Sequence, residues 1–239
     1  MSHTEREEFG DLRKGTFPYP VFLVLRVILV FLCWVLFGLK LEGLDRVPRK
    51  GPLLIVTNHL HNADAVILSI SCPRPLHFMA KEELMRIRFI GRLIRLGGAF
   101  PVRRGKADRN AIRRAVATLD QGIALGMFPE GTRSRSWHLE QALPGAGLVA
   151  IMGKAQIQPV AITGSETLPF NGARGRKVRP WYVRPRVKVV FGAPFDLPTT
   201  TESGGRMNAD AATEMMMRSV AVLLPEQYRG VYGDEAKIT

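Results

Sequence analysis

The sequence predicts an α/β fold: a mixed, largely parallel sheet flanked by helices, with an N-terminal membrane-associated helical segment. Three observations predict it. Short apolar runs alternate with longer segments of helical periodicity, which is the pattern of strands and crossover helices. The chain has 239 residues and is 46% hydrophobic, enough for one sizeable core. An almost uninterrupted apolar stretch, residues 21–39, precedes the alternating part.

The apolar stretch 21–39, "VFLVLRVILVFLCWVLFGL", contains one charged residue, Arg26. As a helix it is roughly 28 Å long, about the thickness of a bilayer's hydrocarbon core. The sequence after it, "KLEGLDRV", lacks the small-residue cleavage site of a secretory signal. Three placements stay open: a helix that spans the bilayer while Arg26 snorkels, a helix lying in one leaflet, or a buried core helix.

The charge of the chain indicates an anionic partner. It has 34 Lys and Arg against 21 Asp and Glu, a formal net charge of +13. No nucleic acid is expected, because the aromatic residues are not interleaved with basic ones in any recognisable binding module. The apolar stretch favours an anionic phospholipid membrane instead. Two cysteines do not form a disulfide framework, so we expect a reducing compartment.

These features predict a location and a division of the chain. We expect the protein at the cell membrane, on its cytoplasmic face, anchored by residues 17–40. Aromatic residues near the ends of that segment, including Tyr19 and Trp34, suit an interfacial helix. We divide the chain into an anchoring segment, 1–45, and a catalytic domain, 46–239.

The first half of the folded part reads strand, helix, strand, helix, strand. "PLLIVTN" follows a turn rich in proline and glycine and is apolar on both faces, as in a buried strand. Asn62 or Asp64 can cap the helix after it. "KEELMRIRFIGRLIRL" carries apolar residues at helical spacing and is predicted as a helix. The five elements are residues 52–58, 63–71, 76–81, 81–96 and 97–104.

The second half continues the alternation. A helix with Ile112, Val116 and Leu119 on one face is stopped by Gly122. A small-residue helix and a long C-terminal helix lie between and after the remaining strands. These elements are residues 107–122, 123–128, 144–155, 157–164, 187–194 and 208–227. The basic loop 168–186, with Trp181 and Tyr182, is either a solvated hairpin or a loop that contacts lipid headgroups.

The motif "NHLHNAD" places His59 at the end of a strand and Asp64 in the first turn of the next helix. The turn between them can bring an imidazole and a carboxylate together, which is the general-base arrangement of acyl-transfer enzymes. Two other interpretations stay open. The residues can form a capping turn with a solvated histidine. Alternatively, His59, His61 and Asp64 can be part of a metal site, although no further ligand-like cluster follows.

Two further motifs lie where strands are predicted to end. "MFPEGTRSRS" places Glu130, Gly131 and Arg133 in a loop, where backbone amides and the arginine can hold a phosphate or an oxyanion. The plainer interpretation is an Arg–Glu pair that fastens the loop. "FPVRRGKADR" places Arg103 after the third strand; arginine binds phosphate bidentately, but the segment also fits an ordinary basic turn.

Taken in order, these motifs resemble the conserved blocks of the glycerolipid acyltransferase superfamily. "NHLHNAD" resembles the NHxxxxD motif, "GGAFPVRR" the second block, "FPEGTRS" the third, and "IQPVAI", with Pro159, the fourth. "KEEL" resembles the K-x-E-L element that precedes the second block. The length and the N-terminal apolar helix look most like the bacterial 1-acyl-glycerol-3-phosphate acyltransferases.

The resemblance implies transfer of an acyl chain from acyl-CoA or acyl-acyl-carrier protein to the sn-2 hydroxyl of a lysophosphatidic acid, giving phosphatidic acid. It implies no metal and no cofactor besides the acyl thioester co-substrate. His59 would be the general base and Asp64 its orienting partner. The remaining roles carried over are binding of the acceptor phosphate, by Arg103, Lys81 and Arg133, and shaping of the acceptor pocket or oxyanion site, by Glu130, Gly131 and Thr132.

The sequence departs from the family pattern at two places. Many relatives have serine where His61 stands, and the proline usual after K-x-E-L is absent, with Arg88 near its place. Three alternatives therefore stay open. They are an acyltransferase with another acceptor (glycerol 3-phosphate, another lysophospholipid or a glycolipid), a metal-dependent hydrolase, and a membrane-binding protein without catalysis.

Overall fold

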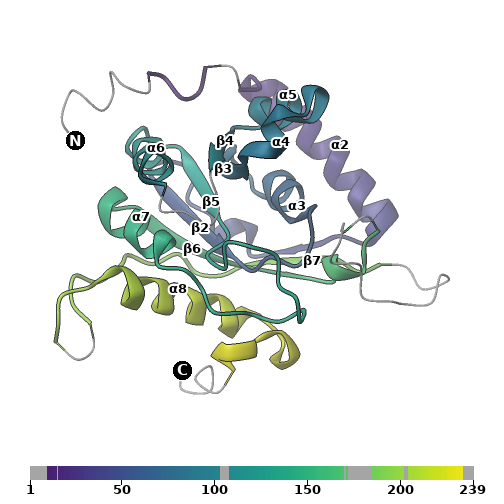
Figure 1. Cartoon of the computed structure of the whole chain (residues 1–239). Helices are drawn as coiled ribbons and strands as arrows, with labels where there is room; N and C mark the ends of the chain where they lie inside the picture. The colour runs from purple at the N-terminus through teal and green to yellow at the C-terminus, as the bar shows by residue number, and fades with distance from the viewer. Residues whose placement is uncertain are drawn as a thin grey trace.

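A computed structural model describes residues 10–14, 16–102, 108–169, 171, 185–201 and 204–233. Its centre is a seven-stranded sheet in the order β1-β7-β6-β2-β5-β3-β4 (Figure 1). The strands are β1 Lys40–Glu42, β2 Leu53–Thr57, β3 Leu76–Lys81, β4 Ala99–Val102, β5 Ala124–Met127, β6 Gln156–Thr163 and β7 Lys188–Phe191. The predicted α/β class is confirmed, and with it each of the six predicted strands.

The sheet is mixed because of its last two strands. Strands β2 to β6 are mutually parallel, whereas β7 runs antiparallel to β6. Strand β1 was not predicted; it is three residues long and pairs in parallel with β7. Lys40 and Glu42 at its ends hide it from a search for apolar runs. The division of the chain at residue 45 stays a prediction, but β1 lies before that point and belongs to the sheet.

Helices cover both faces of the sheet. They are α2 Tyr19–Phe37, α3 Asp64–Ser71, α4 Glu82–Arg86, α5 Arg88–Leu96, α6 Arg109–Asp120, α7 Gly145–Gly153 and α8 Ala209–Leu223. Helices α6, α7 and α8 pack on one face, and α2 and α3 pack on the other (Figure 1). Side chains of β2 alternate between the two cores: Leu54 and Val56 face α7 and α8, while Leu53 and Ile55 face α3.

The predicted helix 81–96 is two helices. Ile87 is extended, with φ −72° and ψ 113°, and separates α4 from α5. The break lets α5 fold back onto α4, so closely that a Cβ on Gly91 would stand 2.2 Å from the carbonyl oxygen of Met85. Arg95 Nη2 donates to the same oxygen at 2.6 Å. The apolar spacing is helical on both sides of the break, so periodicity alone does not reveal it, and the family's proline is not needed to make it.

Helix α2 lies along the sheet from one edge to the other. At its start, Phe17 N donates to Leu96 O at 3.0 Å, on the side where β4 begins. At its end, Gly38 takes the left-handed conformation (φ 59°) and stops the helix. Leu39 then enters the core, and Lys40 N donates to Val187 O at 2.9 Å. The end of α2 therefore lies at the edge where the parallel strands finish.

Candidate active site

Asn58 fixes the chain where β2 leaves the sheet. Its side-chain Nδ2 donates to Ile162 O at 2.7 Å, and its Oδ1 accepts from Ile162 N at 2.8 Å. The amide thus continues the pairing of β2 with β6 by one more residue. His59, the next residue, is held beyond the carboxyl ends of the parallel strands, the edge at which open α/β sheets bind ligands.

The turn after β2 brings His59 and Asp64 together, as the motif suggests. His59 Nδ1 is 3.0 Å from Asp64 Oδ2, and the two residues are 7% and 0% exposed. The same oxygen accepts the backbone N–H groups of Leu60 and His61, each at 2.6 Å. The imidazole stacks on the ring of Phe128, with centroids 4.1 Å apart. One buried carboxylate therefore sets both the turn and the ring.

The expected helix cap is wrong. Helix α3 has Ala63 at its N-cap and no side-chain cap hydrogen bond. Asp64 is instead the first helical residue, and its carboxylate turns back to the loop before it. Asn62 uses its backbone N–H, which donates to Asn171 Oδ1 at 3.2 Å.

His61 is occupied by structural hydrogen bonds. Its Nδ1 accepts from Ala63 N at 3.0 Å, so its Nε2 carries the proton and donates to Pro169 O at 3.0 Å. Burial lowers the pKa of His61, which keeps the ring neutral. Both nitrogens are used, which leaves no free lone pair for a metal ion. The residue that departs from the family pattern ties the turn to the segment after β6.

The loop after β5 forms hydrogen bonds to both backbone groups of His59. Glu130 Oε1 accepts from His59 N at 3.1 Å and its Oε2 accepts from Glu140 N at 3.1 Å. His59 O accepts from Ser134 N at 2.8 Å. Glu130 is 5% exposed, so it faces protein and not solvent. Its described contacts position the histidine, and a role of Glu130 in the acceptor pocket or oxyanion site stays a prediction.

The next residues of this loop are Gly131, Thr132 and Arg133. Gly131 has φ +67°, a left-handed conformation that favours glycine. Thr132, half-buried, follows it. Arg133 Nη1 donates to the side-chain oxygen of Asn171 at 2.8 Å and also to its carbonyl oxygen. Phosphate binding by Arg133 stays a prediction; the observed contact fastens the segment after β6.

Lys81, one of the predicted phosphate-binding residues, lies toward the β4 side of the same edge. Lys81 ends β3 and pairs in register with Val102, the last residue of β4. Its Nζ is 3.4 Å from Glu83 Oε1, and the two side chains are 49% and 65% exposed. Arg103 lies outside the described residues, as do Trp181 and Tyr182. Strand β3 is separated from β2 only by β5, so Lys81 lies roughly 10 Å across the sheet from the strand that carries His59.

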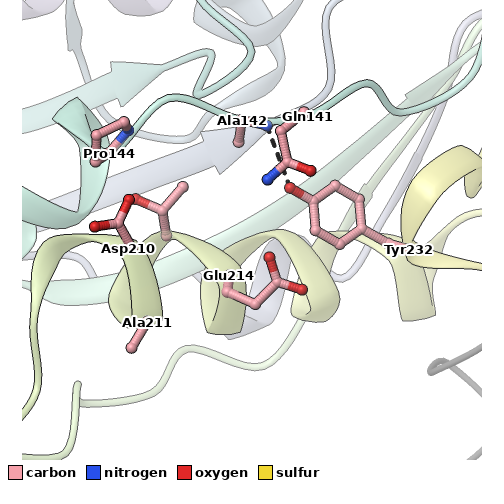
Figure 2. A pocket seen from close by; sticks show the side chains of 8 residues that line it. Gln141, Ala142, Pro144, Asp210, Ala211, Glu214 and Tyr232 are labelled. Carbon is pink, nitrogen blue, oxygen red and sulfur yellow. Dashed lines mark hydrogen bonds between the residues drawn. The ribbon is translucent and has the colours of Figure 1, made fainter.

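A cavity of about 300 Å³ lies elsewhere, between the segment 141–144 and helix α8 (Figure 2). Tyr232 accepts a hydrogen bond from Ala142 N at 3.3 Å at its border. Its charged lining residues are the carboxylates Asp210 and Glu214. None of the predicted site residues lines this cavity, and its acidic lining does not suit a phosphate-bearing substrate.

Asn171 contributes most to the site among the residues that sequence reasoning missed. Asn171 Nδ2 donates to Leu60 O at 3.1 Å, while its Oδ1 accepts from both Asn62 N and Arg133 Nη1. It therefore joins the turn after β2 to the loop after β5. An asparagine in a basic loop gives no local sign of such contacts, whereas Asn58, directly before the histidine, is expected from the motif to help set the turn.

Burial raises the pKa of Glu130 to about 7, against a usual value of 4.5. The Glu130 carboxyl is therefore protonated more readily in the folded chain than in the unfolded chain. Its contribution to the free energy of unfolding is fully present below pH 4.5 and is lost as the pH rises through 7. We expect the free energy of unfolding, measured by urea titration, to fall by about 3 kcal/mol more in the wild type than in Glu130→Gln between pH 4.5 and 8. Parallel pH profiles of the two proteins would contradict this.

The fold and the site define the class of protein. A sequence model of the acyltransferase family, "Acyltransferase", matches residues 38–163, which include β1 to β6 and every residue of the predicted site. The chain belongs to this acyltransferase family.

Individual relatives refine this class. The chain is 33% identical over 177 residues to a 1-acyl-sn-glycerol-3-phosphate acyltransferase of Streptococcus pneumoniae, covering 72% of this chain and 62% of that protein. It is 27% identical to the Bacillus subtilis protein of the same name, covering 78% and 88%. The matched part thus spans under two thirds of the pneumococcal relative.

A solved structure has the same fold. The crystal structure of the 1-acyl-sn-glycerophosphate (LPA) acyltransferase PlsC from Thermotoga maritima matches with a TM-score of 0.62 and 23% identity. The match covers 92% of this chain and 80% of that one. At this identity the likeness establishes the architecture, and the chemistry has to be argued from the site.

Proposed function

We propose that this protein transfers an acyl chain from an acyl thioester to the sn-2 hydroxyl of 1-acyl-glycerol-3-phosphate, giving phosphatidic acid. The His59–Asp64 contact of 3.0 Å, with the loop after β5 bound to both backbone groups of His59, carries the proposal. The names of the pneumococcal and Bacillus relatives support the choice of acceptor. The donor is acyl-CoA or acyl-acyl-carrier protein.

The contacts of His59 support a direct transfer. A carboxylate only accepts, so Nδ1–H donates to Asp64 and the lone pair lies on Nε2. Nε2 takes the proton of the acceptor hydroxyl as its oxygen attacks the thioester carbonyl. The tetrahedral intermediate collapses, the C–S bond breaks, and the thiolate leaves with that proton. Asp64 stabilises the imidazolium between the two steps, so no covalent acyl-enzyme is required.

No metal or other cofactor enters this proposal. Among the described residues no group of three His, Cys, Asp or Glu side chains is arranged to hold a metal ion. The donors that a hydrolase would need are engaged: His61 by Ala63 and Pro169, and His59 Nδ1 by Asp64. Since the thioester is already activated, a base and an electrostatic clamp suffice for the reaction.

We also propose that α2 lies in one leaflet on the cytoplasmic face and does not cross the membrane. It is long and apolar enough to span, and none of it is buried, which argues against a core helix. Arg26 does not extend toward a membrane surface: it donates to the carbonyl oxygens of Ser71 and Cys72 at 3.1 and 2.9 Å. The start, middle and end of α2 are thus all attached to the folded domain. A helix perpendicular to the membrane plane would therefore pull the folded domain into the bilayer.

Substitution of the predicted phosphate-binding residues tests whether the acceptor carries a phosphate. We expect Lys81→Ala and Arg103→Ala each to raise KM for lysophosphatidic acid roughly tenfold or more, because each removes a charge-assisted hydrogen bond to the phosphate. The KM for the thioester should change little. Arg86→Ala is the matched control, since its side chain is 75% exposed and pairs with Glu82.

The assay uses a panel of lysolipid acceptors and one labelled acyl thioester, with and without a chelator. Equal effects of Lys81→Ala and Arg103→Ala on both KM values would contradict the phosphate role. Preference for an acceptor without a phosphate monoester would favour another branch of the family, and loss of activity with the chelator would favour a metal site.

A further inference from the structure

A cavity of about 900 Å³ lies at the edge of the sheet where the parallel strands begin. Its lining includes Gly51, Pro75 and Ala124, which stand at or just before the starts of β2, β3 and β5. The candidate active site is at the other end of these strands. One length of β2 separates the two places, roughly 17 Å. The cavity is therefore distinct from the His59 site.

Every charged side chain that lines this cavity is basic. They are Arg13, Arg49, Lys50 and Arg74, and no Asp or Glu is among the lining residues. His77 also lines the cavity, but burial lowers its pKa to about 4, so its ring is neutral at pH 7 and adds no charge. Four positive charges around one cavity attract an anion.

Arg74 builds the floor of the cavity. It is 8% exposed and donates to the carbonyl oxygens of Pro48, Gly51 and Gly122 at 3.0, 2.9 and 2.9 Å. These bonds hold the turns before β2 and β5 together around a buried guanidinium that has no carboxylate partner among the described residues. Arg49 and Lys50 are exposed at the rim of this rigid base.

The remaining wall connects the cavity to the membrane helix. Thr16, Phe17, Pro18 and Tyr19 line it, and Tyr19 is the first residue of α2. Twelve large apolar side chains of α2, from Tyr19 to Leu36, are exposed along the helix. The cavity thus opens where an apolar surface begins, as expected for a ligand whose charged end is in water and whose tails are in lipid.

We propose that this cavity binds the phosphodiester headgroup of an anionic phospholipid, in a second lipid site separate from the catalytic one. Arg49, Lys50 and Arg13 surround the headgroup, Arg74 supplies buried charge beneath it, and Phe17 and Tyr19 contact the upper part of its acyl chains. Since α2 runs from this cavity to the catalytic edge, a lipid bound here fixes that edge at the membrane. The inference rests on the membrane association proposed above but not on the acyl-transfer chemistry.

The test uses Arg49→Gln/Lys50→Gln, which removes two rim charges and leaves the buried Arg74 in place. Lys154→Gln/Arg206→Gln is the matched control, since it removes the same charge from exposed residues beside α7 and α8 on the opposite face. Binding of the full chain is measured to phosphatidylcholine vesicles with and without phosphatidylglycerol. We expect the cavity variant to bind phosphatidylglycerol vesicles roughly tenfold to thirtyfold more weakly than wild type, and the control to lose much less.

A second measurement distinguishes a headgroup site from general surface charge. Dihexanoyl-phosphatidylglycerol below its micelle concentration, and free coenzyme A, are each titrated into the three proteins by calorimetry. We expect saturable binding of the short lipid to wild type and control, and its loss in the cavity variant.

Three results would overturn the proposal. The cavity variant and the control could bind phosphatidylglycerol vesicles equally. The cavity variant could lose affinity for coenzyme A alone, which would make the cavity a nucleotide-phosphate site. Wild type could bind neither kind of vesicle, which would also remove the proposed membrane association; acyl transfer to a soluble acceptor would still be measurable and would test the enzymatic function separately.

Discussion

Replacing His59 by alanine is expected to lower kcat/KM for acyl transfer roughly a thousandfold, the contribution typical of a positioned general base. The imidazole is held by the buried Asp64 carboxylate just beyond the carboxyl end of β2. Membrane association should be unchanged, because the contacts that hold α2 on the domain do not involve His59. Activity is measured as phosphatidic acid formed from a labelled acyl thioester and lysophosphatidic acid.

The fold of this variant should survive. Asp64 keeps the N–H groups of Leu60 and His61, and Glu130 keeps the backbone N–H of residue 59. His138→Ala is a matched control, since that half-buried histidine lies in the loop after β5 and contacts Ser136 and not His59. Turnover by His59→Ala close to that of His138→Ala would rule out His59 as the base.

Asp64→Asn is expected to lower kcat roughly a hundredfold while changing stability little. An amide oxygen in the place of Oδ2 can still accept from His59, Leu60 and His61, so ring and turn keep their geometry. The amide nitrogen falls at Oδ1, which has no hydrogen-bond partner among the described residues. What is lost is the negative charge that stabilises the imidazolium during transfer.

Asp64→Ala separates charge from structure. It leaves the Nδ1–H of His59 and two buried backbone N–H groups without their acceptor, at about 1–3 kcal/mol for each unsatisfied group. We therefore expect inactivity together with a clearly lower melting temperature. If Asp64→Asn instead unfolds as readily as Asp64→Ala while its specific activity stays normal, Asp64 is a structural residue only.

Much of the fold followed from local pattern. The buried strand "PLLIVTN" and the helix α6, stopped before Gly122, were predictable because the apolar period and the turn residues agree there. The N-terminal cap of α6 was not predicted: Asp108 Oδ1 accepts from Ala111 N at 3.0 Å. Strand β1 was not predictable, since its place is fixed by pairing with β7, far along the chain. The break at Ile87 likewise depends on the packing of α5 against Met85.

The candidate site shows the same division. The meeting of His59 and Asp64 followed from a strand, a short turn and a helix start, which are all local. The roles of Glu130, Asn171 and His61 depend on contacts across the sheet edge: Glu130 reaches the backbone of a residue 71 positions earlier. Residue type marked Glu130 and His61 as polar groups of the site but did not show what each would bind, because backbone partners have no signature in sequence.

The position of the basic cavity and of the His59 site relative to the membrane depends on how α2 lies on the domain. Hydropathy identified an apolar helix but not its orientation on the domain. The contacts of Phe17 and Lys40 put its two ends at opposite edges of the sheet. One helix lying in a leaflet would therefore hold both the basic cavity and His59 near the membrane surface.

The most direct test of the proposed mechanism is to follow the acyl group itself. Purified protein is mixed with a labelled acyl thioester, with or without lysophosphatidic acid, and the label is located in lipid and in protein. We predict label in phosphatidic acid only when the acceptor is present, none on the protein, and neither product with His59→Ala. Label on the protein in the absence of acceptor, or phosphatidic acid formed by His59→Ala at the wild-type rate, would contradict direct transfer with His59 as the base.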